Sequence, residues 1–235
     1  IIAQSVYYFY CYFLAEDDNQ PINFSVPTGN FGDVYAGYLA KKLGLPINKL
    51  IVATNQNDIL HRAISKGKYE AEHVSETISP SMDIQIASNF ERLIYDLNNH
   101  DSSQTLDDMK NIKQNGKYTI DDEKLKKINQ DFLSARMSEQ ETLDVIKNIY
   151  EKFNMVLDPH TAIGYGAFDK HDLKGNNIVL ATAHPCKFPD AILKAINLKS
   201  DLPDELKFIL DEKENYGIIE NNLKEIKQYI LGKIK

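Results

Sequence analysis

The sequence predicts an α/β fold in which a mostly parallel sheet is flanked by helices. In the first half, a short strand candidate at residues 22–26, a turn-rich loop, an amphipathic stretch at 33–43 and an apolar stretch at 49–54 follow one another. This order is typical of a βαβ unit, whose crossover makes its two strands parallel. Later, an apolar stretch at 177–183 followed by a helical pattern from Pro189 is expected to return the chain to the sheet.

Three parts are expected along the chain. Residues 1–97 form part of the α/β domain, residues 98–137 a helical insertion or subdomain, and residues 138–235 a carboxy-terminal α/β part that returns to the sheet. A capping box of Ser138 and Glu141 predicts a helix that starts at 138. The further helices expected within these parts are 57–65, 84–97, 105–114, 121–129 and 162–170.

The composition is that of an ordinary soluble globular protein. Of the 235 residues, 43% are hydrophobic and 26% are charged, which excludes disorder, a collagen-like chain and a membrane bundle. The net charge is −7 and the basic residues are spread along the chain, so a general nucleic-acid binder is not expected. Cys11 and Cys186 cannot build a disulfide framework or a multi-thiolate zinc site, and the expected location is therefore the reducing cytoplasm.

Residues 1–15 predict a helix that is buried inside a larger protein. Ile2, Val6, Phe9 and Phe13 recur at helical spacing. The stretch lacks the basic start of a signal peptide and is shorter than the roughly 20 apolar residues of a membrane-spanning helix. An apolar opening without a capping sequence leads us to expect that an amino-terminal portion of a longer chain is missing.

The sharpest local signal is the segment Pro27-Thr-Gly-Asn-Phe-Gly-Asp33, between a strand end and a helix start. Its glycines let backbone amides converge, and the helix amino terminus adds partial positive charge, so the segment predicts a phosphate site. It lacks the Lys-Ser/Thr of a P-loop and the third glycine of a dinucleotide loop. On geometry alone, a tight turn without a ligand explains the segment about equally well.

Two weaker signals lie in the second half. Thr182 stands near the end of the predicted strand 177–183, where ligands bind in open parallel sheets, although a structural threonine also explains it. The segment Asp158-Pro-His-Thr161 is typical of a turn into a helix capped by Thr161, with His160 as a general base being the less favoured interpretation. The six histidines have no zinc-site spacing, and no G-x-S-x-G elbow is present.

Together and in this order, the motifs of the chain resemble those of the threonine synthase family. The resemblance covers most of the chain and is weakest from 98 to 130. The segments that carry it are VPTGNFGD (26–33), KLGLP (42–46), KLIVATNQNDILHR (49–62), SPSMDI (79–84), SNFER (88–92), DPHT (158–161) and TAHP (182–185).

The resemblance implies a pyridoxal-phosphate enzyme with a fold of the tryptophan-synthase-β type. Such an enzyme converts O-phosphohomoserine and water into threonine and phosphate, the last step of threonine biosynthesis. In this interpretation the part at 1–97 binds the cofactor phosphate, and Thr182 donates a hydrogen bond to the pyridine nitrogen, where a neutral partner tunes the cofactor's electron sink. The residues expected to hold the cofactor phosphate are Gly29, Asn30, Phe31, Gly32 and Asp33.

One departure from the family is severe. The Schiff-base lysine of the family lies in a segment upstream of Ile1, and no residue of this chain matches it. Lys41 and Lys42 follow the glycine loop but belong to the outgoing helix, where solvated charges are expected. We therefore expect the 235 residues alone to be an inactive half-site, completed by a missing amino-terminal portion or by another chain.

Two other functions remain open. A related phospholyase would eliminate phosphate and release a keto acid, with the same cofactor-binding residues. A noncatalytic remnant would bind a phosphate ligand or a partner chain. No membrane or nucleic-acid partner is expected, and the expected small-molecule partner is O-phosphohomoserine.

Overall fold

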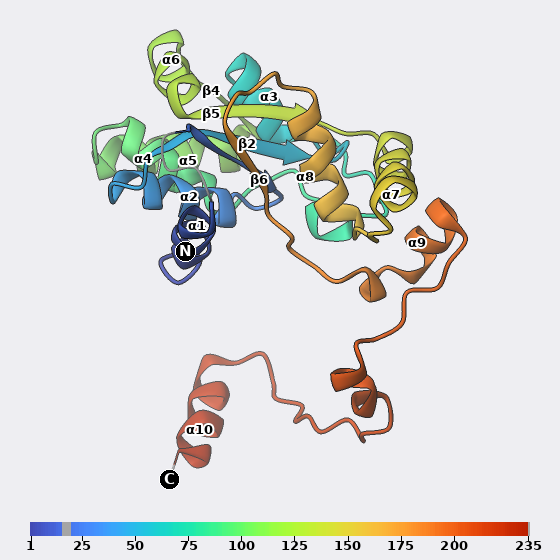
Figure 1. Ribbon diagram of the computed structural model, residues 1–235. Helices are drawn as coiled ribbons and strands as arrows, with labels where there is room; N and C mark the ends of the chain where they lie inside the picture. The colour runs from blue at the N-terminus through green and yellow to red at the C-terminus, as the bar shows by residue number, and fades with distance from the viewer. Residues whose placement is uncertain (16–19, 235) are drawn as a thin grey trace. The chain divides into compact units, whose positions relative to one another are not determined.

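Four parallel strands form the main sheet, in the order β5-β2-β1-β6 (Figure 1). The strands are β1 (Ile22–Pro27), β2 (Ile47–Thr54), β5 (Phe132–Arg136) and β6 (Asn176–Val179). The structure, a computed structural model, describes residues 1–15 and 20–234. The chain divides into two compact units, Ile1–Ser200 and Asp201–Lys235. The predicted α/β fold with a mostly parallel sheet is confirmed, and all four strands belong to the first unit.

Helices surround this sheet in the first unit. They are α1 (Ser5–Leu14), α2 (Gly32–Lys42), α3 (Ile59–Lys66), α4 (Phe90–Leu97), α5 (Ser102–Asn115), α6 (Asp122–Asp131), α7 (Glu139–Phe153), α8 (Pro159–Asp169) and α9 (Pro189–Ile196). Short 3-10 turns, η1 (Pro80–Met82) and η2 (Pro185–Lys187), and a small antiparallel sheet of β3 (Lys68–Glu70) and β4 (Lys117–Thr119) complete the unit. The second unit contains the 3-10 helix η3 (Asp204–Leu210) and α10 (Leu223–Lys233).

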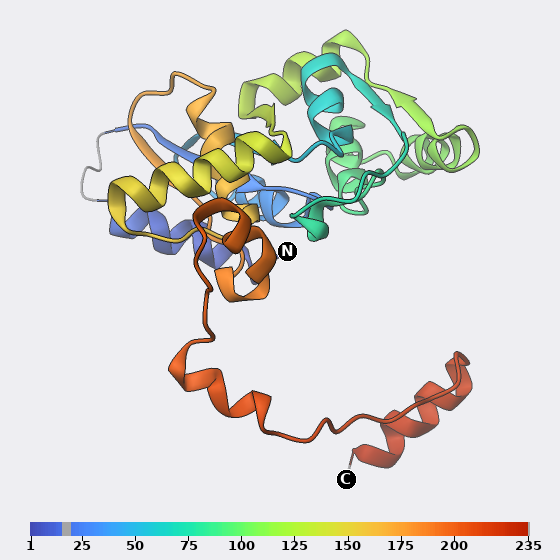
Figure 2. The ribbon, with the colours of Figure 1, turned by 90° about the vertical axis from the view of Figure 1, so that its right-hand side faces the viewer.

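The sheet is covered on both faces, as a parallel sheet requires. Successive side chains of β2 point to opposite faces: Leu50 and Val52 join the core formed with α2, α3 and α4, whereas Ile51 and Ala53 join the core formed with α8. Figure 1 shows α8 lying across the strands, and Figure 2 shows the long helix α7, which packs against α8 and α9. Burial on both faces explains why this strand is a continuous apolar run in the sequence.

The predicted strand 177–183 is too long. Strand β6 ends at Val179, and the last ladder bond is donated by Leu180 N to Ser25 O at 3.0 Å. The next bond in a parallel ladder would need the backbone N–H of Pro27, which proline lacks. Strand β6 is an edge strand, and its residues are half-buried or exposed rather than buried.

Other element boundaries also differ from the expectation. Strand β5 lies at the opposite edge of the sheet and was not predicted, and the helix expected at 84–97 begins only at Phe90. Ser138 and Glu141 form the predicted capping box at the start of α7. Helix α8 is capped by Asp158, which accepts hydrogen bonds from the two backbone amides that follow Pro159, so the prediction of Thr161 as the cap is wrong.

Helix α1 packs through a face different from the predicted one. Tyr8 is fully buried, and its hydroxyl donates to the backbone oxygen of Asp33 at 2.8 Å. Ile2, Val6 and Phe13, which the periodicity placed on the buried face, are exposed. The tyrosine ring fits because α2 has a glycine opposite it: a Cβ at Gly37 would overlap Cε1 of Tyr8.

No helix within 1–15 and 20–234 has both the length and the apolar character that crossing a bilayer requires.

Replacing Gly37 by alanine is expected to loosen α1 from α2. The new methyl group would overlap the Tyr8 ring and approach Leu50 Cδ2 at 2.9 Å, so the free energy of unfolding should fall by about 1–3 kcal/mol. Chemical denaturation measures this change. Gly232→Ala in α10, where a Cβ meets nothing within 4 Å, is the control and should cause no loss. Equal stability of the two variants would contradict the proposed contact.

The exposed apolar residues of α1 are expected to promote self-association, because exposed apolar patches favour contacts between molecules. Val6 and Phe13 are 60% and 75% exposed. The double variant Val6→Lys, Phe13→Lys should remain monodisperse in light scattering at concentrations where the parent chain associates, with an unchanged melting temperature. A monodisperse parent chain would show that this face does not drive association.

Candidate functional site

A cavity of about 270 Å³ gathers the motifs of the sequence at the carboxyl ends of the strands. We call it the motif cavity. It receives residues from the glycine loop, from η1, from the start of α8 and from the segment after β6. Its lining residues are Gln4, Pro27, Gly29, Asn30, Asp33, Ser81, Met82, His160, Thr182, Ala183, Lys187 and Phe188.

The glycine loop turns from β1 into α2 through a left-handed residue. That residue is Phe31, with φ of 69°, and not one of the glycines. Its buried ring contacts Phe90 edge-on at 5.1 Å between centroids and Phe132 at 5.7 Å. A left-handed conformation costs a non-glycine residue about 1–2 kcal/mol. These aromatic contacts hold Phe31 beneath the loop, and it does not line the cavity.

Gly29 lies against the backbone of η1. A Cβ at this position would be 2.6 Å from the backbone oxygen of Ser81 and 3.2 Å from Cα of Met82. Only glycine permits this close approach. The glycine loop and η1 therefore form one wall of the cavity together.

A buried polar network holds η1 in this position. The side-chain amide of Asn55, which follows β2, donates to Ser79 Oγ at 2.9 Å and to Asp83 Oδ1 at 2.7 Å. The amide of Asn57 donates to the same Asp83 oxygen at 2.9 Å, and Thr77 N donates to Asp83 Oδ2 at 2.8 Å. The network fixes Ser79-Pro-Ser-Met, one of the motifs found in the sequence, to the end of β2.

Asn30 stabilises the loop through two hydrogen bonds. Its side-chain oxygen accepts a hydrogen bond from Gly32 N at 3.0 Å, and its backbone oxygen accepts one from Asn89 N at 3.0 Å. Within the described part of the chain, the backbone amides of Gly29, Asn30 and Asp33 have no hydrogen-bond acceptor. These amides, at the amino terminus of α2, are the donors that the loop can offer to an anion.

The side chain of Asp33 faces α1. The Tyr8 hydroxyl lies 3.3 Å from Asp33 Oδ1 and also donates to the backbone oxygen. Burial raises the pKa of Asp33 above its ordinary value, although the hydrogen bond from Tyr8 partly lowers it. A carboxylate would repel a phosphate, so the contribution of Asp33 to an anion site is its backbone N–H.

His160 and Asp158 form a buried pair at the start of α8. His160 is 4% exposed, and its Nδ1 lies 3.1 Å from Asp158 Oδ1. Thr161 Oγ1 donates to the other oxygen of Asp158. Burial acts to raise the pKa of Asp158, but the hydrogen bonds from His160 and Thr161 outweigh it, and the pKa is lowered. The ring of His160 contacts Phe188 at 4.8 Å.

Thr182 lines the motif cavity but belongs to no strand, because β6 ends before it. It is exposed, and it also lines an adjoining cavity of about 610 Å³ next to α1. Gln4, Asp33 and Thr182 belong to both cavities.

The structure thus brings four of the six predicted site residues into one cavity. Gly29, Asn30, Asp33 and Thr182 line the cavity, whereas Phe31 and Gly32 do not. Lys187, on η2, also lines it and was not singled out from the sequence. Its place beside the TAHP motif was the only signal that could have found it.

The two lysines after the glycine loop point elsewhere. Lys41 forms an ion pair with Asp131 at 2.6 Å, and Lys42 forms one with Asp96 at 3.3 Å. Neither lines the motif cavity. Their predicted position on the outgoing helix is confirmed.

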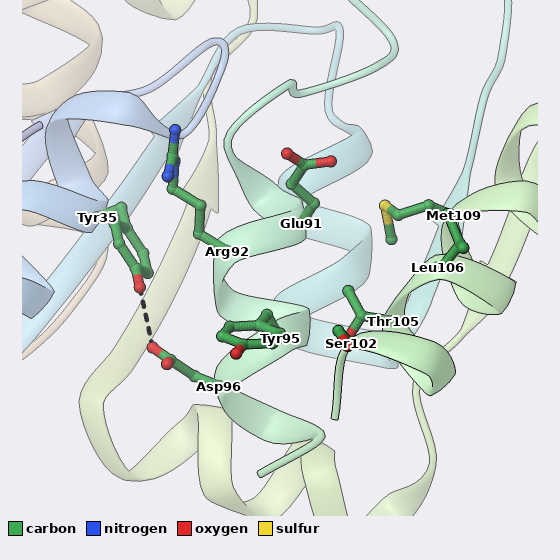
Figure 3. A pocket seen from close by; sticks show the side chains of 9 residues that line it. All are labelled: Tyr35, Glu91, Arg92, Tyr95, Asp96, Ser102, Thr105, Leu106 and Met109. Atoms are coloured by element: carbon green, nitrogen blue, oxygen red, sulfur yellow. Dashed lines mark hydrogen bonds between the residues drawn. The ribbon is translucent and has the colours of Figure 1, made fainter. Parts of the chain in front are cut away.

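Another cavity, of about 550 Å³, lies between α4 and α5 (Figure 3). In Figure 3, Tyr35 of α2 donates a hydrogen bond to Asp96 at 3.0 Å, and Glu91 and Arg92 of the SNFER motif point away from that pair. This 550 Å³ cavity is not lined by any residue of the glycine loop, by Thr182 or by His160. The motif cavity is therefore the candidate functional site. No group of three or more His, Cys, Asp or Glu side chains in the described residues could hold a metal ion.

Comparisons with known proteins give one consistent result. The family model "Threonine synthase, C-terminal" matches residues 161–230. Threonine synthase of Pseudomonas aeruginosa is 39% identical over 233 residues, which cover 98% of this chain and 50% of that protein. Threonine synthase of Saccharomyces cerevisiae is 43% identical, with 94% of this chain and 48% of that protein covered.

A solved structure agrees with the sequence comparisons. The crystal structure of pyridoxal-phosphate-bound threonine synthase from Brucella melitensis superimposes with a TM-score of 0.90 at 42% identity, covering 97% of this chain and 50% of that one. The chain spans about half the length of the relatives it matches. The agreement of motifs, fold and relatives establishes that the chain belongs to the threonine synthase family.

Proposed function

We propose that this chain provides the phosphate-binding side of a pyridoxal-phosphate enzyme that makes threonine and phosphate from O-phosphohomoserine and water. The observation that carries the proposal is the motif cavity, in which a glycine loop at a helix amino terminus lies in one space with Thr182 and a buried histidine. Membership of the threonine synthase family supports the same reaction.

The residues of the cavity fit the cofactor. At Gly29 the loop has no room for a Cβ, and the free amides of Gly29, Asn30 and Asp33 suit a phosphate group. The hydroxyl of Thr182 suits a heterocyclic nitrogen as a neutral hydrogen-bond partner. When bound, pyridoxal phosphate supplies an electron sink for the bonds of an amino-acid substrate.

Phe31 and Gly32 have a supporting role in this proposal. Phe31 provides the left-handed turn from β1 into α2. A Cβ at Gly32 would meet Asn30 Oδ1 at 3.0 Å and Asn89 Nδ2 at 3.2 Å, so a larger residue would displace the side chain of Asn30. Both residues shape the loop without lining the cavity.

The covalent step requires a lysine amine, and the motif cavity does not contain a suitably placed one. Lys187 is the one lysine among the lining residues, and it is an exposed residue at the end of η2. We propose that the lysine that reacts with the cofactor comes from sequence outside these 235 residues, since the relatives are about twice as long. The proposed cellular location is the cytoplasm, on the composition argument given above.

Substitutions in the glycine loop should weaken phosphate binding. Gly32→Val is expected to lower the affinity for pyridoxal phosphate or inorganic phosphate more than tenfold, about 1.4 kcal/mol or more. Gly29→Ala should do the same, because its methyl group would overlap Ser81 O. Isothermal titration calorimetry measures both, with Gly232→Val in α10 as the control. If both loop variants bind these ligands as tightly as the parent, the loop is not the phosphate-binding site.

The reaction itself is tested with O-phosphohomoserine. The 235-residue chain should release no phosphate above the free-cofactor background, because it lacks a suitably placed lysine. Borohydride reduction with pyridoxal phosphate should label no single lysine stoichiometrically, and Lys187 is the position to inspect by mass spectrometry. Turnover by this chain with one labelled lysine would overturn the half-site proposal.

Addition of the remaining part of the enzyme should then produce activity. Threonine as the product supports the synthase, a keto acid would indicate a phospholyase, and no activity would favour the noncatalytic alternative. In the active form, Thr182→Val should lower the rate strongly without changing the melting temperature, because it removes only a hydrogen bond to the ring. The exposed Thr119→Val, in β4, is the matched control.

A further inference from the structure

His160 has a buried nitrogen that nothing in the protein satisfies. Its Nε2 is inaccessible to solvent and has no hydrogen-bond partner among the described residues, although the residue lines the motif cavity. An unsatisfied polar atom in a buried position costs about 1–3 kcal/mol. Such an atom beside a ligand cavity is explained if a ligand completes its hydrogen bonding.

The surroundings determine which proton the ring carries. Asp158 is 1% exposed, its pKa is lowered by its hydrogen bonds, and its Oδ1 lies 3.1 Å from Nδ1 of His160. An ionised carboxylate can only accept, so Nδ1 is the protonated nitrogen of the neutral ring. Nε2 then carries a lone pair and can accept a hydrogen bond.

The ring is also fixed in orientation. Asp158 Oδ1 accepts a second hydrogen bond from the backbone N–H of His160 at 2.9 Å, while Thr161 Oγ1 binds Oδ2. The ring of Phe188 packs against the imidazole, tilted by 51° with 4.8 Å between the centroids. The acceptor at Nε2 is therefore preorganised, on a residue at the start of α8 that lines the same cavity as the glycine loop.

We propose that Nε2 of His160 accepts a hydrogen bond from the ligand of the motif cavity, and that Asp158 is a positioning residue that sets its tautomer. The inference rests on the proposed function and adds a property of the ligand to it. The cavity selects a molecule with a phosphate for the loop amides and, at a second point, a hydroxyl or amine hydrogen for His160.

The test combines one spectroscopic and one binding measurement on the protein together with the remaining part of the enzyme. In protein labelled with ¹⁵N-histidine, long-range proton–nitrogen spectra should show the Nδ1–H tautomer for His160. Saturating pyridoxal phosphate should shift the Nε2 resonance of His160 and leave that of His171 unchanged. His171 is the matched control, because its Nε2 is also buried and unpartnered but the residue does not line the cavity.

Variants give the second readout. His160→Asn should weaken pyridoxal phosphate about tenfold and leave the affinity for inorganic phosphate unchanged, because phosphate alone needs only the loop. His160→Gln, whose amide can reach the position of Nε2, should recover part of the affinity, and His171→Asn should bind as the parent does. Asp158→Asn should move His160 towards the Nε2–H tautomer, because an amide can donate to Nδ1.

The outcomes separate this inference from the function on which it rests. If the parent binds pyridoxal phosphate but the His160 resonance does not move and His160→Asn binds equally well, the inference is overturned and the proposed function stands. If the parent binds no pyridoxal phosphate, both are overturned. Loss of inorganic phosphate binding in His160→Asn would indicate a disturbed loop and would also count against the inference. The spectra of the parent protein test the inference even if a variant fails to fold.

Discussion

The parallel direction of all four strands is the constraint on which the rest of this protein depends. It brings the carboxyl ends of β1, β2 and β6 to one edge of the sheet, although residues of other elements separate them in the chain. The glycine loop leaves β1 there, Asn55 follows β2 and holds η1, and the segment with Thr182 follows β6. A cavity in which residues from five sequence segments meet is a direct result of this shared direction.

The fold class was readable from the sequence because the two central strands are buried on both sides. Strand β2 is buried from Leu50 to its end, so it appears as an apolar run in the sequence, and all six residues of β1 are buried although Asn23 and Ser25 are polar. The edge strands are different: β5 contains Ser134 and Arg136 and carries little apolar signal, so it was missed. Strand β6 was made too long because its end is set by Pro27, a residue of another strand, which no local pattern contains.

The part of the candidate site that could be predicted is the part whose backbone geometry is encoded by neighbouring residues in the sequence. The glycines of the loop indicated close backbone approach, and Gly29 meets η1 in that way. The left-handed residue could not be assigned from sequence, since Phe31 adopts this conformation only through contacts with Phe90 and Phe132. The position of Lys187 and the unpaired nitrogen of His160 depend on tertiary structure, so the sequence offered only their motifs. The roles predicted for Gly29–Asp33 and Thr182 stay predictions.

The aromatic support of Phe31 also bears on how the loop forms during synthesis. Phe31 leaves the ribosome long before Phe90 and Phe132, and its left-handed backbone costs about 1–2 kcal/mol without them. A nascent chain that has released only the first βα unit therefore has a glycine loop free to sample other conformations. The left-handed turn of the loop is stabilised when β5 joins the sheet, so the proposed phosphate site takes its final shape late in translation.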